Sequence, residues 1–305
     1  MNGTPTHIAV FGDVHGHLRL MFQLCRHWQV QNRQFLDGIL QCGDLGFFPN
    51  LGMLDKATMR FAQRDPEELG FAYFFRKVPP PAERDPLLER TLRGDPDDLN
   101  TVRCHVIFCH GNHEDFQALD WLTGGGAYCS VDTFDRIFLL RSGETCELGN
   151  VRVGALGGKP EYDRPADSQV LGPTVSHRAA RRLMRQRFDI LLSHGAPTGA
   201  NVTGEPLGSH LSRQVLEASR PAYHFYSHHK NPIPPAKIGP TECHWLEDVN
   251  FRLDRSAGTH TGPPAPGCMG ILSWRSQEEH HFEIVDIPWF QSLNGNNWLD
   301  DSTRA

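Results

Sequence analysis

Five apolar segments of this chain have the pattern of buried β-strands, and each ends in a short polar cluster rich in glycine, acid or imidazole. In an open α/β sheet the carboxyl ends of parallel strands line one edge, so such clusters meet although most of the chain separates them. The pattern therefore predicts an α/β fold with one polar site at an edge of the sheet. The five clusters are residues 12–17, 43–46, 110–114, 193–197 and 228–230.

The first cluster follows a predicted strand at residues 8–11 and precedes residues 17–31, where apolar side chains recur at helical spacing. A second strand follows at residues 38–42, and this order of strand, helix and strand predicts a parallel sheet. Shorter strands later in the chain predict a second, antiparallel sheet layer. We expect them at residues 136–141, 145–148 and 151–156, with strands at 245–251, 269–274 and 282–287 closing that second sheet.

Residues 47–100 form the least regular part of the chain, with one predicted helix at 69–76 and a triple proline at 79–81. Successive prolines favour an extended surface segment. We interpret this stretch as an insertion over one edge of the sheet, and a solvated loop is favoured over a substrate lid. One domain is expected at residues 1–290, with a polar tail at 291–305.

Composition narrows the function classes. The 305 residues carry a formal charge of −6, which gives no global attraction to nucleic acid but leaves a local basic groove open. There is no run of eighteen apolar residues and the N-terminus is polar, so neither secretion nor a membrane span is expected. The eight cysteines are scattered without a C-x-x-C pair, which favours buried thiols in a reducing cytoplasm.

A predicted helix at residues 174–188 has one apolar face and one basic face. A solvated face is the favoured interpretation of the basic stripe, and contact with a phosphate backbone is the alternative. The stripe consists of Arg178, Arg181, Arg182 and Arg185.

The residue types in the polar clusters suit a pair of divalent cations, although the first cluster alone fits an ordinary strand-to-helix turn equally well. Two nearby cations need a shared anionic bridge, which Asp44 can supply, and neutral ligands that preserve the positive charge of the site. His113, next to a candidate ligand, is expected to be a general acid or charge stabiliser. We assign Asp13, His15 and Asp44 to a first cation, and Asp44, Asn112, His194 and His228 to a second.

The order of these motifs resembles the calcineurin-like metallophosphoesterases, over about residues 7–230. The resemblance implies an α/β fold with two packed, mixed β-sheets flanked by helices. It also implies that the assigned residues are metal ligands and that His113 contacts the phosphate. The matching motifs are D-x-H at Asp13 and His15, G-D at residues 43–44, G-N-H-E at 111–114, S-H-G at 193–195, and the late His228.

Two branches of that family share further details with the chain. Residues 223–228, an aromatic strand leading into the last histidines, look like the branch that contains RNA lariat debranching enzymes, and so do residues 39–44. Protein Ser/Thr phosphatases share residues 12–16 and 111–114. Their longer signature G-D-x-V-D-R-G is absent, because residues 43–48 read G-D-L-G-F-F, and this disfavours a phosphoprotein phosphatase.

One position departs from the family pattern. The family usually ends its last motif with two histidines one residue apart, and Lys230 stands where the histidine after His228 is expected. An ammonium group has no lone pair with which to coordinate a metal. Three arrangements follow: the first cation binds weakly with water in the vacancy, or His229 or His260 replaces the ligand, or the Lys230 ammonium lies between the two carboxylates as a fixed charge.

The resemblance implies a phosphoester hydrolase in which one or two divalent ions, Mn, Fe or Zn, activate a water that attacks phosphorus. His113 and Asp44 are the expected catalytic residues, and His113, Asn112 and Lys230 are expected to contact phosphate. The favoured substrate is a phosphodiester in a nucleotide or in nucleic acid such as RNA. The alternatives are a phosphomonoesterase, including a protein phosphatase, and a phospho-ligand-binding scaffold, which Lys230 makes credible.

Overall fold

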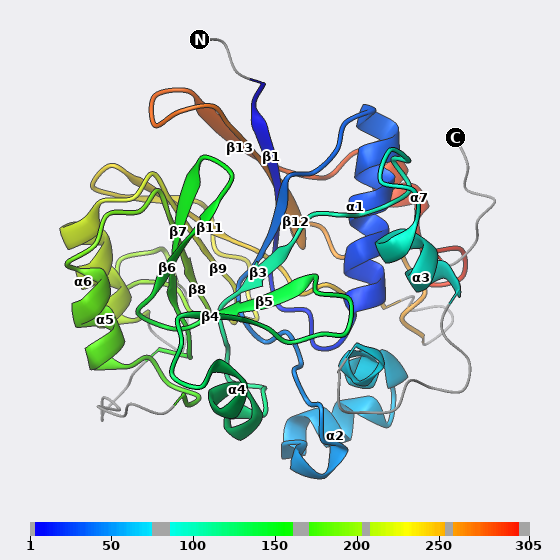
Figure 1. Ribbon diagram of the computed structural model, residues 1–305, viewed down its shortest axis with the longest axis horizontal. Helices are drawn as coiled ribbons and strands as arrows, with labels where there is room; N and C mark the ends of the chain where they lie inside the picture. The colour runs from blue at the N-terminus through cyan, green and yellow to red at the C-terminus, as the bar shows by residue number, and fades with distance from the viewer. Residues whose placement is uncertain (1–3, 75–85, 161–170, 203–207, 254–258, 299–305) are drawn as a thin grey trace.

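Two β-sheets pack face to face and helices cover their outer faces in the computed structural model of the chain (Figure 1). The structure describes residues 4–74, 86–160, 171–202, 208–253 and 259–298. The predicted α/β fold of two packed, mixed sheets flanked by helices is confirmed. The triple proline and the last seven residues of the predicted tail lie outside the described residues.

The first sheet has seven strands in the order β13-β12-β1-β2-β3-β5-β4. The run from β1 through β2 and β3 to β5 is parallel, so these strands end at the same edge. Helix α1 (Leu18–Asn32) connects β1 to β2, as the sequence predicts. The strands are β1 (Thr6–Phe11), β2 (Gly38–Gln41), β3 (Val106–Phe108), β4 (Tyr128–Ser130), β5 (Ile137–Leu140), β12 (Met269–Trp274) and β13 (His280–Ile284).

The second sheet has six strands in the order β10-β11-β9-β8-β7-β6. Its four inner strands are parallel, and each edge strand is antiparallel to its neighbour. The strands are β6 (Thr145–Leu148), β7 (Val151–Leu156), β8 (Ile190–Ser193), β9 (Tyr223–Tyr226), β10 (Ala236–Ile238) and β11 (Thr241–Trp245).

Several strand assignments from the sequence were wrong. The second sheet is mainly parallel, and β5, β12 and β13 belong to the first sheet, where β12 pairs antiparallel with β1. No strand spans the described residues 245–251, because β11 ends at Trp245 and Phe251 makes only an isolated bridge with Pro264. Apolar periodicity shows that a segment is a buried strand, but pairing depends on chain paths that periodicity does not encode.

The alternation of side chains along β1 explains why this strand is apolar throughout. Ile8 and Val10 pack between the two sheets, whereas Ala9 and Phe11 face the layer covered by α1. All four are fully buried. A strand whose two faces are both covered needs a continuous apolar run, which explains the sequence of β1.

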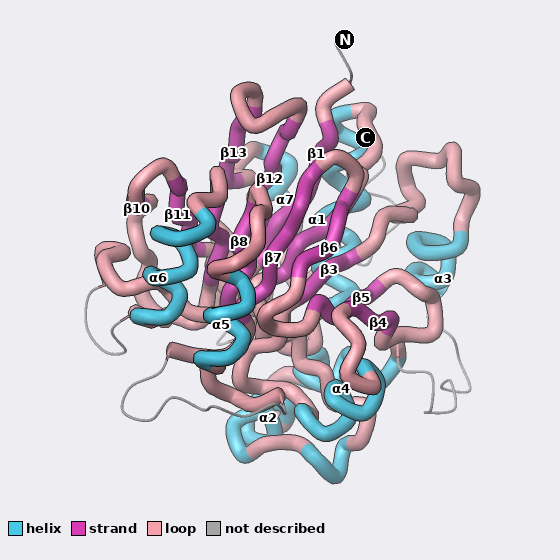
Figure 2. Tube along the Cα trace, turned by 60° about the vertical axis from the view of Figure 1, so that its left-hand side comes forward, coloured by secondary structure: helices cyan, strands magenta, loops and turns pink. Residues whose placement is uncertain are grey.

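The outer face of the second sheet is covered by α5 (His177–Leu183) and α6 (His210–Ser219), which lie side by side (Figure 2). Helix α5 is shorter than the predicted segment 174–188. After Leu183, the backbone forms tight turns in which Arg185 and Gln186 bond to carbonyls three residues earlier. Arg185 therefore lies beyond the end of the helix.

The described parts of residues 47–100, which are 47–74 and 86–100, are more ordered than the favoured solvated loop, and that interpretation was wrong for them. Phe71 and Phe74 are fully buried, and the helix expected at 69–76 is instead the 3-10 helix η2 (Pro66–Tyr73). No described helix combines the length and apolar character needed to cross a membrane. The remaining helices are η1 (Leu51–Met53), α2 (Lys56–Ala62), α3 (Pro86–Arg93), α4 (Phe116–Thr123) and α7 (Pro288–Ser292).

Packing between the sheets predicts a large cost for truncating a buried side chain there. Ile190 is fully buried in this layer, so Ile190→Ala is expected to lower the free energy of unfolding by about 2–5 kcal/mol. Urea denaturation measures the change. The matched control is Ile284→Ala, on the exposed end of β13, with an expected cost below about 1 kcal/mol. Equal costs would contradict the assigned core.

Candidate metal centre

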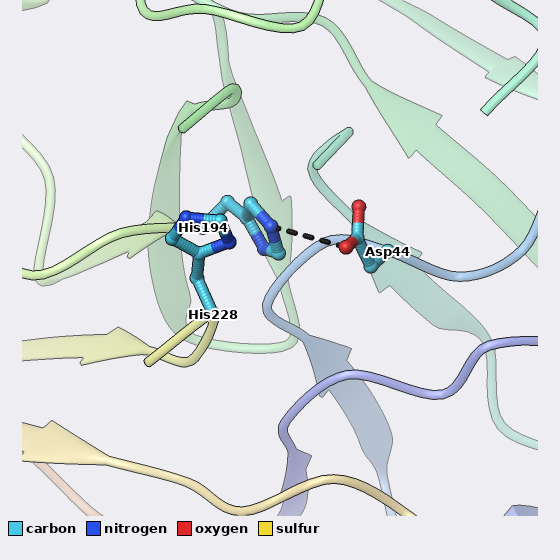
Figure 3. Close-up of side chains that lie close together, drawn as sticks. All are labelled: Asp44, His194 and His228. Atoms are coloured by element: carbon cyan, nitrogen blue, oxygen red, sulfur yellow. Dashed lines mark ion pairs between the residues drawn. The ribbon is translucent and has the colours of Figure 1, made fainter. Parts of the chain in front are cut away.

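Two overlapping groups of acidic and imidazole side chains lie at the carboxyl ends of parallel strands. One group contains Asp13, His15 and Asp44, and the ligand atoms of its members lie within 4.8 Å of one another. The other contains Asp44, His194 and His228, at the same limit (Figure 3). Asp44 is common to both groups, so one carboxylate lies where two neighbouring cations would need a shared ligand.

The backbone around these side chains is held in an uncommon conformation. His15, Asp44 and His228 have φ angles of 42°, 52° and 69°, in the left-handed region that non-glycine residues rarely adopt. The carboxylate of Glu114 accepts hydrogen bonds from the backbone N–H groups of Leu45 (2.9 Å) and Gly111 (2.9 Å). Glu114 therefore joins the loops after β2 and β3 directly behind Asp44.

The two oxygens of Asp44 have different surroundings. Oδ1 accepts the backbone N–H groups of Asn112 (2.5 Å) and His113 (2.7 Å). Gly111 permits this approach, because a Cβ at that position would clash with Oδ1. Oδ2 remains directed toward the imidazoles, 3.8 Å from Nε2 of His15 and 3.3 Å from Nε2 of His194.

His194 shows why these groups suit a cation. Its Nδ1 lies 3.1 Å from the carbonyl oxygen of Cys42, which can accept the ring proton and leave Nε2 with a lone pair. Nε2 lies 3.1 Å from Oδ1 of Asn112 and 3.3 Å from Oδ2 of Asp44. Three electron-rich atoms then converge, and a bound divalent cation would satisfy them together.

Burial perturbs the protonation of the whole group. It raises the pKa of Asp13 well above its usual range, and the negative charges of Asp248 and Asp44 add to this effect. Burial also raises the pKa of Asp44, but the charge and hydrogen bond of His194 outweigh it and hold that pKa well below the usual range. The two carboxylates therefore respond oppositely when no cation compensates them.

The imidazoles of His15 and His228 are neutral at pH 7, as metal coordination requires. Burial lowers the pKa of His15 to about 4 and that of His228 to about 2. Oδ1 of Asp13 is buried and makes no hydrogen bond within the described part of the chain, and Nδ1 of His194 lies 3.4 Å from it. Neutral nitrogens, a carboxylate common to both groups and a buried carboxylate oxygen without a hydrogen bond fit divalent cations of the Mn, Fe or Zn type.

His113 has a partner that the sequence did not reveal. Its Nδ1 lies 2.7 Å from Oδ2 of Asp55, which also caps α2 through the N–H groups of Ala57 and Thr58. Burial lowers the pKa of His113, but the hydrogen bond that its ring donates to Asp55 and the charge of Asp44 outweigh it and raise the pKa to about 9. The sequence feature that could have revealed Asp55 is an acid directly before a short helix. This feature lies in residues 47–100, where a loop without a role was favoured.

The structure separates the three arrangements proposed around Lys230. Lys230 is exposed and makes no ion pair with any described carboxylate, so a fixed ammonium between Asp13 and Asp44 is wrong. His229 accepts the N–H of Ala196 at Nε2 (3.0 Å), and Nδ1 of His260 lies 2.9 Å from the carbonyl oxygen of Phe251. Neither histidine belongs to the two groups of candidate ligands. A more weakly bound first cation, with water in place of the missing ligand, stays a prediction.

Asp248 is a further carboxylate near Asp13 that the sequence did not single out. It follows β11, and the N–H of the next residue, Val249, donates to the carbonyl of Asp13 (2.7 Å). Burial raises the pKa of Asp248 to about 6, with a further contribution from the charge of Asp44. It lies outside both groups of candidate ligands, so it acts on them through its charge.

Comparisons with known proteins agree with this geometry. The family model described as calcineurin-like phosphoesterase matches residues 6–232. A lariat debranching enzyme of Arabidopsis thaliana is 23% identical over 252 residues, which are 72% of this chain and 54% of that protein. The chain thus spans about half the length of this curated relative.

Solved structures align with nearly the whole chain at low identity. One aligns with 92% of this chain and 99% of its own, with a TM-score of 0.52 and 10% identity, and it shares the fold. The structure of TT1561 from Thermus thermophilus aligns with 93% of this chain and 100% of its own, with a TM-score of 0.47 and 12% identity.

Sharing of Asp44 predicts an order of metal loss. Asp44→Ala is expected to lose more bound manganese than any single histidine variant, because it removes a ligand from both groups. His228→Ala should lose more than His15→Ala if the second site is the tighter one. Exposed Lys230→Ala serves as the control and should lose least. Elemental analysis after reconstitution and dialysis measures the content, and greater loss from Lys230→Ala than from His228→Ala would contradict the assignment.

The contact with Asp55 predicts the titration of His113 in the metal-free protein. With the carboxylate present, His113 stays protonated up to a pKa of about 9 and loses its proton above that pH. Asp55→Asn removes the charge, so this pKa is expected to fall to about 6.5 or lower. Proton NMR of the ring measures it. Asp65→Asn, which changes an acid paired with His17, is the control and should leave His113 unchanged.

Proposed function

Because the chain belongs to the calcineurin-like phosphoesterase family, we propose that this metal-dependent phosphoester hydrolase acts on phosphodiesters of a nucleotide or nucleic acid. The observation that carries the proposal is the pair of overlapping side-chain groups joined by Asp44. Two cations on either side of one carboxylate can activate a water and polarise the oxygens of a phosphate ester.

The roles proposed for the side chains follow from their surroundings. A first cation would be held by Asp13, His15 and Asp44, and a second by Asp44, Asn112, His194 and His228. The backbone N–H groups on Oδ1 of Asp44 keep this carboxylate oriented toward the imidazoles. Asn112 and exposed Lys230 are proposed to contact phosphate oxygens of the substrate.

His113 is proposed as the general acid. Its Nδ1 is engaged by Asp55, so the proton available to the substrate is on Nε2. The pKa of about 9 keeps the ring protonated at neutral pH, when a leaving alkoxide needs a proton. Asp55 is a positioning residue, because it orients the ring and favours its charged form without contacting the substrate.

The choice of a diester rests on two independent features. The curated relative is a lariat debranching enzyme, and the same branch carries an aromatic strand before its last histidines, like Tyr223–Tyr226 here. The exposed arginines of α5 provide local positive charge in a chain of net charge −6. Manganese as the cation, a cytoplasmic location and a single domain at residues 1–290 also remain predictions.

Hydrolysis of two model esters tests the proposal. With added manganese, the protein is expected to hydrolyse a bis-aryl phosphate with a higher kcat/KM than the mono-aryl phosphate. His113→Asn should lower kcat by about 10²- to 10⁴-fold, because it removes the proposed acid, while metal content is retained. His281→Asn, which changes an exposed histidine on β13, is the control.

The other outcomes identify the alternatives. Faster hydrolysis of the monoester would favour a phosphomonoesterase. No hydrolysis of either ester, with no difference from Asp44→Ala, would favour a scaffold that binds phosphorylated ligands. An unchanged kcat in His113→Asn would contradict the assignment of the acid.

A further inference from the structure

A cavity of about 430 Å³ lies beside the candidate metal centre and is large enough for a small ligand. His110 lines the cavity and precedes Asn112 by two positions, a separation of at most about 7 Å along an extended chain. The loop after β7 forms another wall, where the N–H of Gly158 donates to the carbonyl of His110 (2.9 Å). The cavity is therefore connected to the metal centre through the loop after β3, although none of the candidate ligands lines it.

Positive charge predominates among the described residues that line this cavity. Three of them are arginines, Arg141, Arg178 and Arg182, and one is an acid, Glu144. Nη2 of Arg141 lies 2.8 Å from Asp120, and Nη1 of Arg182 lies 2.8 Å from Glu144. Arg178 makes no ion pair with the described carboxylates, so its guanidinium remains available to a ligand. We call this cavity the arginine pocket.

Neutral groups in the arginine pocket complete the surroundings of an anionic ligand. Nδ1 of His110 is buried and has no hydrogen-bond partner among the described residues. The hydroxyl of Ser176, at the start of α5, makes no capping bond to the helix. Arginine and hydroxyl donors bind phosphate oxygens, whereas His110 forms part of the wall, because its unpartnered Nδ1 is buried against Gly157. Leu171 and Pro173 add an apolar wall that suits a sugar or base.

We propose that the arginine pocket binds a phosphate that flanks the scissile phosphate of an oligonucleotide. This inference rests on the proposed function, because it takes the metal centre as the place of the scissile phosphate. The predicted arginine stripe then divides by position. Arg178 and Arg182 line the pocket, whereas Arg185 lies beyond α5 and does not line it. Of these three arginines, only Arg185 would then belong to a solvated face.

Inhibition by two probes tests the proposal. A short single-stranded RNA and inorganic phosphate are measured as competitive inhibitors of bis-aryl phosphate hydrolysis. In Arg178→Gln, the Ki of RNA is expected to rise about tenfold, because one charge-assisted contact is lost. The Ki of inorganic phosphate, which needs only the metal centre, should change much less. The slope of log Ki for RNA against log salt should fall by about 0.7.

Arg185→Gln is the matched control, since it removes the same charge from the same surface without altering the pocket. Equal effects of the two substitutions on RNA would overturn the proposal, because charge alone would then explain binding. Equal weakening of RNA and phosphate in Arg178→Gln would also overturn it. If the wild-type protein hydrolyses no bis-aryl phosphate, the proposed function fails separately. Fluorescence anisotropy of labelled RNA then tests the arginine pocket, by comparing the affinity of Arg178→Gln for RNA with that of Arg185→Gln.

Discussion

The burial of two carboxylates in one pocket is the constraint on which the rest of this structure depends. Asp13 and Asp44 lie at adjoining strand ends, almost without exposure to water, where two negative charges are costly unless they are compensated. The pKa values of His15 and His228 are lowered, so these two imidazoles do not supply that charge at pH 7. Bound divalent cations would resolve this conflict, and Glu114 joins the two loops that hold Asp44 and Asn112.

The fold supplies this arrangement through the alignment of two sheets. β1, β2 and β3 of the first sheet bring Asp13 and Asp44 close to Asn112, and β8 and β9 of the second bring His194 and His228. The apolar layer between the sheets fixes their relative position. A metal centre divided between two sheets therefore depends on the packing of the whole core, and the family assignment agrees with it.

The sequence predicted the elements whose signals are local and missed those that depend on distant partners. Strand-end motifs identified Asp44 and its neighbours because each motif is a few residues long. The pairing of β12 with β1 and the contact of Asp55 with His113 join segments far apart in the chain, and no periodicity encodes them. The exposed position of Lys230 was equally unpredictable, because a substitution at a ligand position does not show where the new side chain points.

Anomalous diffraction from crystals soaked in manganese tests the central claim most directly. The account predicts two anomalous peaks about 3.5–4 Å apart, on either side of the Asp44 carboxylate, with the peak beside His194 and His228 the stronger. A single peak is compatible only if it lies beside those two histidines. Peaks away from Asp44, or none at manganese concentrations that support hydrolysis, would contradict it.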